Sequence, residues 1–272
     1  MRARWLPPVM IAVLGCEARV DTCARPPRAS VAVYTGTRLL PGDALVPGRV
    51  VACGDDAAAV ADLVTALERV PAQLAPSRVV LHVEPEVASG ARAVGRVEQH
   101  RPSGAILVAA GDSELGQAVW LHEIAHVIGT GPAPQGRVAE RLYGAIQEAF
   151  ADYFAATFSG SSRVGALQGE LRELERQRLP TASAWSALAL PGAFPTHRFG
   201  AALAGLWWKR APRDRTLVFD LGKCFASNDP WPQGAITPES TLREFVRRCP
   251  ARSRDVVRET LHRWVPKELY QG

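Results

Sequence analysis

The chain lacks the basic segments typical of nucleic-acid-binding proteins and, after its first fifteen residues, the long apolar runs typical of membrane-spanning proteins. Its 272 residues contain no lysine-rich tail and no basic stripe interleaved with aromatic residues, and the formal net charge is only +5. We therefore expect no nucleic-acid partner. After the first fifteen residues, no apolar run approaches the roughly 20 residues that a transmembrane helix requires. Internal repeats and low-complexity segments are also absent from the sequence.

Cysteine is scarce, and its spacing argues against a cysteine-based metal site. None of the five cysteines belongs to a Cys-x-x-Cys pair. Arg2 and Arg4 precede an apolar stretch too short to span a bilayer, so residues 1–15 are typical of a signal peptide. This segment ends in a sequence that resembles a bacterial lipobox, which predicts lipidation of Cys16. Ordinary secretion is the alternative, because Leu14 stands where a smaller residue is preferred.

Export also bears on the other four cysteines. An even number of cysteines in an exported chain indicates two disulfides. Three pairings are possible, and closeness in the sequence favours Cys23–Cys53 and Cys224–Cys249. We expect a cell-envelope lipoprotein or a secreted protein. It would be a monomer and would contact a membrane only through its N-terminal lipid.

The most informative feature present is His-Glu-Ile-Ala-His at residues 122–126. On a helix, His122 and His126 share one face and can bind one tetrahedral zinc ion together. Glu123 is then placed to polarise a metal-bound water. With six histidines in 272 residues, chance would give such a pattern in roughly one chain in a hundred. The pattern therefore needs a third ligand to support it.

A second segment offers that ligand. Apolar residues recur at helical spacing around residues 142–154, and Glu148 and Asp152 lie four positions apart on one face. Two carboxylates on an otherwise apolar helix require a cationic partner. A metal for Glu148 and an imidazole N–H for Asp152 would satisfy them. The alternative is a solvated edge on which both acids pair with arginines.

The two segments together resemble the gluzincin metallopeptidases, and the thermolysin-like group in particular. The second motif of that group reads Gly-Ala-Ile-Asn-Glu-Ala-x-x-Asp, and residues 144–152 match it except that Gln147 replaces Asn. The resemblance implies Glu123 as the general base and Asp152 as the partner of a ligand histidine. It implies one Zn²⁺ per chain, with three ligands: His122, His126 and Glu148.

By the same resemblance, His197 would donate a hydrogen bond to the oxyanion of the tetrahedral intermediate. Two departures from the family pattern concern this part of the site. The aspartate that should precede the histidine is missing, and a tyrosine between the two motifs has no counterpart, with Arg137 near its position. The alternative interpretation of His197 is an ordinary residue at the start of a helix.

The predicted fold is α+β. A tether or irregular entry over residues 16–46 would lead to a zincin-type catalytic core over 47–160, with a small mixed sheet, the zinc helix and the glutamate helix. A mainly helical lobe over 161–272 would complete the active-site cleft. Apolar periodicity predicts its helices over Leu167–Leu174, Ala201–Trp208, Leu242–Arg248 and Asp255–Trp264.

Within the core, periodicity predicts a helix after Asp56 and strands over 78–84 and 105–110. Glu114 would lie in the first turn of the zinc helix, which Gly129 would close. If the strand before the zinc helix is at the edge of the sheet, an extended peptide could pair with Ala109 and Ala110 by strand addition. A strand in the interior of the sheet is the alternative.

The sequence thus predicts a zinc metallopeptidase that hydrolyses a peptide or protein substrate. A zinc-binding cell-envelope protein that binds a partner without hydrolysis is the main rival, favoured by the missing aspartate and tyrosine. A structural lipoprotein whose pentapeptide arose by chance is a third interpretation, and it predicts no stoichiometric zinc.

Overall fold

The computed structural model describes most of the chain between residues 30 and 269. The described residues are 30–35, 39–40, 44–45, 49–50, 57–76, 78–84, 91–98, 101–109, 116–167, 170–227, 229–232 and 237–269. The predicted signal peptide and Cys16, Cys23, Cys53 and Ala110 lie outside them.

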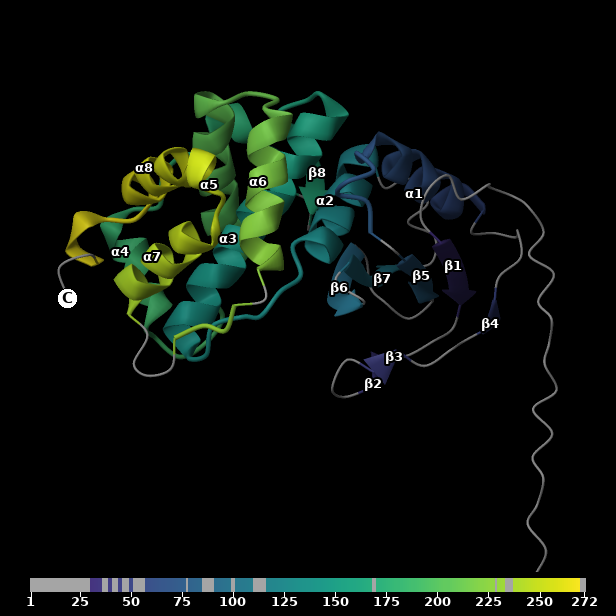
Figure 1. Ribbon diagram of the computed structural model, residues 1–272, viewed down its shortest axis with the longest axis horizontal. Coiled ribbons are helices and arrows are strands. Elements are labelled where there is room, and N and C mark those ends of the chain that lie inside the picture. Colours follow the sequence, from purple (N-terminus) through teal and green to yellow (C-terminus); the bar gives the residue numbers. More distant parts are fainter. Residues whose placement is uncertain are drawn as a thin grey trace, which may run out of the picture.

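Five strands form a mixed sheet, on the right of Figure 1. Their order is β4 (Arg49–Val50), β1 (Ser30–Thr35), β5 (Arg78–Glu84), β7 (Arg101–Ala109) and β6 (Ala91–Glu98). Neighbours among β1, β5 and β7 pair in parallel, whereas β4 and β6 pair antiparallel at the two edges. A separate two-stranded sheet joins β2 (Leu39–Leu40) to β3 (Ala44–Leu45).

The centre of the sheet is apolar. Val79, Leu81 and Ile106 are fully buried, and the spacing of the first two matches the period of two expected for one face of a strand. Strand β5 has the bounds that the sequence predicts. Helix α1 (Ala57–Arg69) is the predicted first helix, and Leu63 and Leu67 on its apolar face are buried.

The sheet corrects two predictions. Ser30–Thr35 is not part of an irregular tether, because it pairs along its length with β5 as strand β1. Strand β7 is not an edge strand, because β5 lies on one side of it, with Glu84 opposite Ala109, and β6 on the other. A peptide cannot add to a strand whose two sides are already paired. The edge position on which the predicted substrate pairing at Ala109 depended is therefore wrong, and the edge on that side belongs to β6.

Two helices follow the sheet and form the middle of the molecule. Helix α2 (Gln117–Ile128) ends at Gly129, whose N–H donates to the carbonyl of Ala125 at 2.7 Å. Helix α2 has no acidic residue in its first turn, and Glu114, which was predicted to lie there, is outside the described residues. Helix α3 (Arg137–Ser159) has 23 residues. It ends where Gly160 adopts a φ of 75°, a conformation that glycine reaches without strain.

The predicted helix over Leu167–Leu174 is mostly wrong. Strands β8 (Arg163–Leu167) and β9 (Glu170–Glu173) form an antiparallel hairpin, and only the short turn η1 (Leu174–Arg176) follows as a 3₁₀ helix. The leucine spacing suits a helix, but Gly169 within it costs about 1 kcal/mol relative to alanine.

The remaining regular elements of the described chain are helices, on the left of Figure 1. They are α4 (Ala182–Trp185), η2 (Ser186–Leu188), α5 (Thr196–Arg210), α6 (Arg215–Ala226), α7 (Pro238–Arg248), η3 (Ala251–Ser253), α8 (Arg254–Trp264) and η4 (Lys267–Leu269). Helices α5, α7 and α8 contain the other three predicted helices. Helix α6 was not predicted, although Asp214 caps it by accepting from the N–H groups of Thr216 and Leu217.

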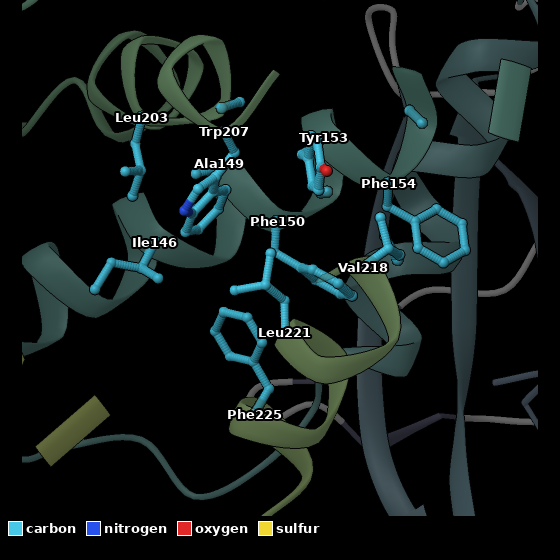
Figure 2. Close-up of a cluster of buried hydrophobic side chains, with 14 of the residues drawn as sticks. Ile146, Ala149, Phe150, Tyr153, Phe154, Leu203, Trp207, Val218, Leu221 and Phe225 are labelled. Carbon is cyan, nitrogen blue, oxygen red and sulfur yellow. The ribbon is translucent and has the colours of Figure 1, made fainter. Parts of the chain in front are cut away.

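A single apolar core joins the two halves of the molecule. Figure 2 shows Phe150 of α3 between Trp207 of α5 and Phe225 of α6, with Phe154 beside Val218 of α6. Cys224 and Cys249 form a disulfide that links α6 to the end of α7. None of the helices in the described part of the chain combines the length and the apolarity needed to cross a membrane.

Candidate metal centre

Two histidines of α2 face one another at the centre of the candidate site. His122 and His126 lie one helical turn apart, and their Nε2 atoms are 3.1 Å apart. His122 is buried, whereas the side chain of His126 is 20% exposed. The pair is therefore reached from the His126 side, and the ring of His122 is held inside the protein.

Helix α3 brings a carboxylate to both imidazoles. Glu148 Oε2 is 3.4 Å from His122 Nε2, and Glu148 Oε1 is 3.5 Å from His126 Nε2. The side chain of Glu148 is only 14% exposed. The described residues thus bring together the three predicted ligands, whose ligand atoms lie within 4.8 Å of one another.

The spacing of these atoms suits a tetrahedral ion. Zinc bonds to nitrogen and oxygen of about 2.0–2.1 Å would separate neighbouring ligand atoms by about 3.3–3.4 Å. The two imidazole Nε2 atoms are 3.1 Å apart, and each has a different Glu148 oxygen near this distance: Oε2 is 3.4 Å from His122 and Oε1 is 3.5 Å from His126. Two imidazoles and one carboxylate also form a donor set that zinc commonly takes. The residues present therefore fit the metal that the sequence predicts.

The electrostatics of the cluster favour a cation at this point. Burial alone would lower the pKa of His122, but Asp152 and Glu148 raise it to about 9. Burial would likewise raise the pKa of Glu148, but His126 and His122 hold it well below its usual range. Both pKa shifts have the same origin, because the carboxylates stabilise positive charge at the ring nitrogens and that charge stabilises the carboxylates. A proton or a metal ion can supply that charge.

Asp152 fixes the orientation of His122 from the far side of the ring. Its Oδ1 is 2.8 Å from His122 Nδ1, and the carboxylate is fully buried. Because a carboxylate accepts, we assign the proton of neutral His122 to Nδ1, which leaves the Nε2 lone pair toward Glu148 and His126. This contact agrees with the role that the resemblance implies for Asp152.

Sequence reasoning missed a third member of this arrangement, Arg172. Its Nη1 is 2.7 Å from Asp152 Oδ1, and its side chain is only 8% exposed. The alternative that placed both acids on a solvated edge is wrong, because Asp152 is fully buried, although Asp152 does contact an arginine as well as a histidine. Arg172 lies in a run of charged residues from Glu170 to Arg176, and nothing in that run distinguishes it from its neighbours.

Glu123 lies beside His122 on α2 and is 2% exposed. Its Oε2 has no hydrogen-bond partner among the described residues. A buried carboxylate oxygen without a donor is costly to maintain, so its retention is typical of a functional group. It is available to accept a proton or a hydrogen bond from a reactant.

His197 lies in the first turn of α5, opposite Glu148. Its Nε2 is 3.4 Å from Glu148 Oε2, and its side chain is 49% exposed. The close approach of α5 to α3 explains this position. A Cβ on Gly200 would lie 2.5 Å from Glu148 Cβ and 2.8 Å from the carbonyl oxygen of Ala145, so only glycine allows the two helices to come so near. His197 therefore belongs to the same cluster as the three candidate ligands.

Comparisons with known proteins add nothing to this geometry. Neither the scan against models of protein families nor the search of curated proteins finds a match to the chain. The functional interpretation depends on the residues of the site alone.

Proposed function

We propose that this chain is a zinc metallopeptidase of the gluzincin type, with a zincin core formed by the sheet, α2 and α3. The observation that supports it best is the convergence of His122, His126 and Glu148 from two helices, with Glu123 adjacent. A chance pentapeptide gives no reason for a carboxylate of another helix to meet both imidazoles.

The residues of the site divide the chemistry among them. His122, His126 and Glu148 would hold the ion, and Asp152 would keep the Nε2 lone pair of His122 directed toward it. When bound, zinc supplies Lewis acidity, which polarises a carbonyl and lowers the pKa of a coordinated water to about 7.

Glu123 is the general base in this proposal. Its carboxylate takes a proton from the attacking water and then delivers it to the nitrogen of the leaving amine. His197 Nε2 donates a hydrogen bond to the carbonyl oxygen as negative charge develops on it. Exposure of His197 and His126 leaves one side of the cluster open to a substrate.

A second candidate function is zinc binding without hydrolysis, as part of a cell-envelope protein that binds a partner. The observation that favours it is the 2% exposure of Glu123, since a general base must reach its water. Export, lipidation and a monomeric state are predictions that accompany either function.

One experiment separates these functions. The purified chain is analysed for bound metal and then incubated with a diverse peptide library, with chelator, and with chelator followed by zinc. The peptidase proposal expects about one zinc per chain and cleavage that chelation removes and zinc restores. Stoichiometric zinc without cleavage would favour the binding protein, and absence of zinc would refute both.

A further inference from the structure

One face of α3 contacts the segment that leads to His197. Arg137, Arg141, Gly144 and Glu148 recur at intervals of four, three and four residues, so they form a continuous stripe along the helix. Glu148 ends this stripe at the candidate metal centre. The other three positions contact the segment 187–196, which runs from η2 to the first residue of α5.

Arg141 makes most of these contacts. Its Nη1 lies 3.0 Å from the carbonyl oxygen of Ala187, 3.1 Å from that of Leu188 and 2.6 Å from that of Leu190. Its Nη2 donates to the carbonyl oxygen of Gly192. One guanidinium thus gathers four carbonyl groups of a single loop, which would otherwise be free to turn toward solvent.

The neighbouring positions of the stripe extend this contact in both directions. Arg137 Nη2 donates to the carbonyl oxygen of Ala189 at 2.9 Å. At the other end, a Cβ on Gly144 would be 3.5 Å from Thr196 Cγ2, so the first residue of α5 lies directly over the helix. Phe194 anchors the last part of the loop, with its ring 6.0 Å from the guanidinium carbon of Arg141.

The loop ends one residue before His197, so its conformation fixes where α5 begins. His197 is half-exposed, and its one ion-pair contact in the described structure is Glu148, at 3.4 Å. The aspartate expected to support this histidine is missing from the sequence. The packing of Gly200 against Glu148 places α5 on α3, and the loop before α5 determines how the helix begins.

We propose that Arg141 is a positioning residue for His197. By binding the carbonyls of Ala187, Leu188, Leu190 and Gly192, it sets the start of α5 and hence the approach of the His197 imidazole to the metal centre. This inference rests on the proposed function for its catalytic consequence. Its structural part, the ordering of the loop, does not.

The structural part is tested without any activity measurement. In the full chain, Arg141→Met should raise amide hydrogen exchange at least about tenfold over residues 189–199, because loss of the hydrogen-bonded loop allows local opening. Arg210→Met is the matched control, since Arg210 lies at the other end of α5 and pairs with exposed Glu259. Exchange in the loop that matches the wild-type protein would overturn the proposal.

The catalytic part is tested by a double-mutant cycle on peptide cleavage. Loss of one oxyanion donor typically costs 10²–10³-fold in kcat, so Arg141→Met should cost about tenfold or more in kcat with little change in KM. Arg141→Lys should recover part of the loss, and zinc content should be unchanged in both variants. The double variant with His197→Ala should be no slower than His197→Ala alone.

The outcomes separate the two proposals. Independent, multiplicative losses in the double variant would show that Arg141 does not act through His197, even if the loop exchanges faster. If the wild-type chain cleaves no peptide, the peptidase proposal fails. Hydrogen exchange then still decides whether Arg141 orders the loop.

Discussion

Removal of the buried cation at Arg172 tests the arrangement behind the metal centre most directly. Arg172 Nη1 is 2.7 Å from Asp152 Oδ1, with the two side chains 8% and 0% exposed. Removing one partner of a buried ion pair typically costs 3–5 kcal/mol, because the other charge is left uncompensated. Asp152 keeps its contact with His122. We therefore expect Arg172→Met to lower the free energy of unfolding of the metal-free chain by about 3 kcal/mol, the low end of that range.

Zinc affinity should fall as well. Changes to the partners of metal ligands typically cost 10–100-fold in affinity. Asp152 contacts the candidate ligand His122, whereas Arg172 contacts Asp152. We therefore expect zinc affinity to fall about tenfold for Arg172→Met and further for Asp152→Asn. Urea denaturation of the metal-free chain measures stability, and competition with a chromophoric chelator measures zinc affinity.

A control and a double variant sharpen the assay. Arg176 is close by in sequence but 80% exposed, and its pair with Glu173 is a surface contact, so Arg176→Met should cost less than about 1 kcal/mol. Arg172→Met combined with Asp152→Asn removes both charges and should be more stable than the sum of the single losses by about 1–3 kcal/mol. Strict additivity, or an Arg172→Met variant as stable as the Arg176→Met control, would refute the reasoning.

Four further outcomes follow from the site and its supports. Glu123→Gln should retain zinc while peptide turnover falls by about 10²–10⁴-fold, the usual contribution of a general base; normal turnover would remove Glu123 from the mechanism. Glu148→Gln should lose most of its zinc on dialysis, measured by metal analysis, whereas full occupancy would contradict the ligand assignment. Gly200→Ala would place a Cβ 2.5 Å from Glu148 Cβ, so it should lower stability by about 1–3 kcal/mol and weaken zinc binding, and unchanged affinity would show that α5 does not constrain Glu148. Reduction of the Cys224–Cys249 disulfide, which spans 25 residues, should cost about 3.5 kcal/mol from loop entropy, measured by thermal unfolding with and without reductant, and an unchanged midpoint would contradict that value.

Local patterns predicted those parts of the fold in which one period dominates. Strand β5 and the helices around Leu63, His122 and Glu148 carry strong apolar periodicity, and the structure has these elements where the sequence predicts them. The sequence did not predict the hairpin β8–β9, because leucines at intervals of four and three residues match the period of a helix. Hydrogen bonding between β8 and β9 determines the structure of that segment. The pattern of residues within one segment does not reveal which strands pair.

The order of strands in the sheet could not be predicted from the sequence for a related reason. An apolar strand such as β7 can lie at an edge or between two neighbours, and its own residues do not distinguish the cases. Strand β6 decides it by pairing with β7 through Ala93 and Val94. Its residues Ala91–Glu98 include two arginines and a glycine and gave no strand signal.

The candidate site was more predictable than the fold around it, because two helical segments hold most of its groups. Once His122, His126, Glu148 and Asp152 are on helices, their spacing fixes which of them share a face, and one packing contact brings the faces together. Arg172 and Arg141 could not be found in this way, since each acts across a contact between elements distant in sequence. Arg172 is the countercharge for Asp152. In our proposal, Arg141 supports the loop that precedes His197. Under the proposed function, the absence of an aspartate before His197 then changes how this histidine is held and does not remove it from the site.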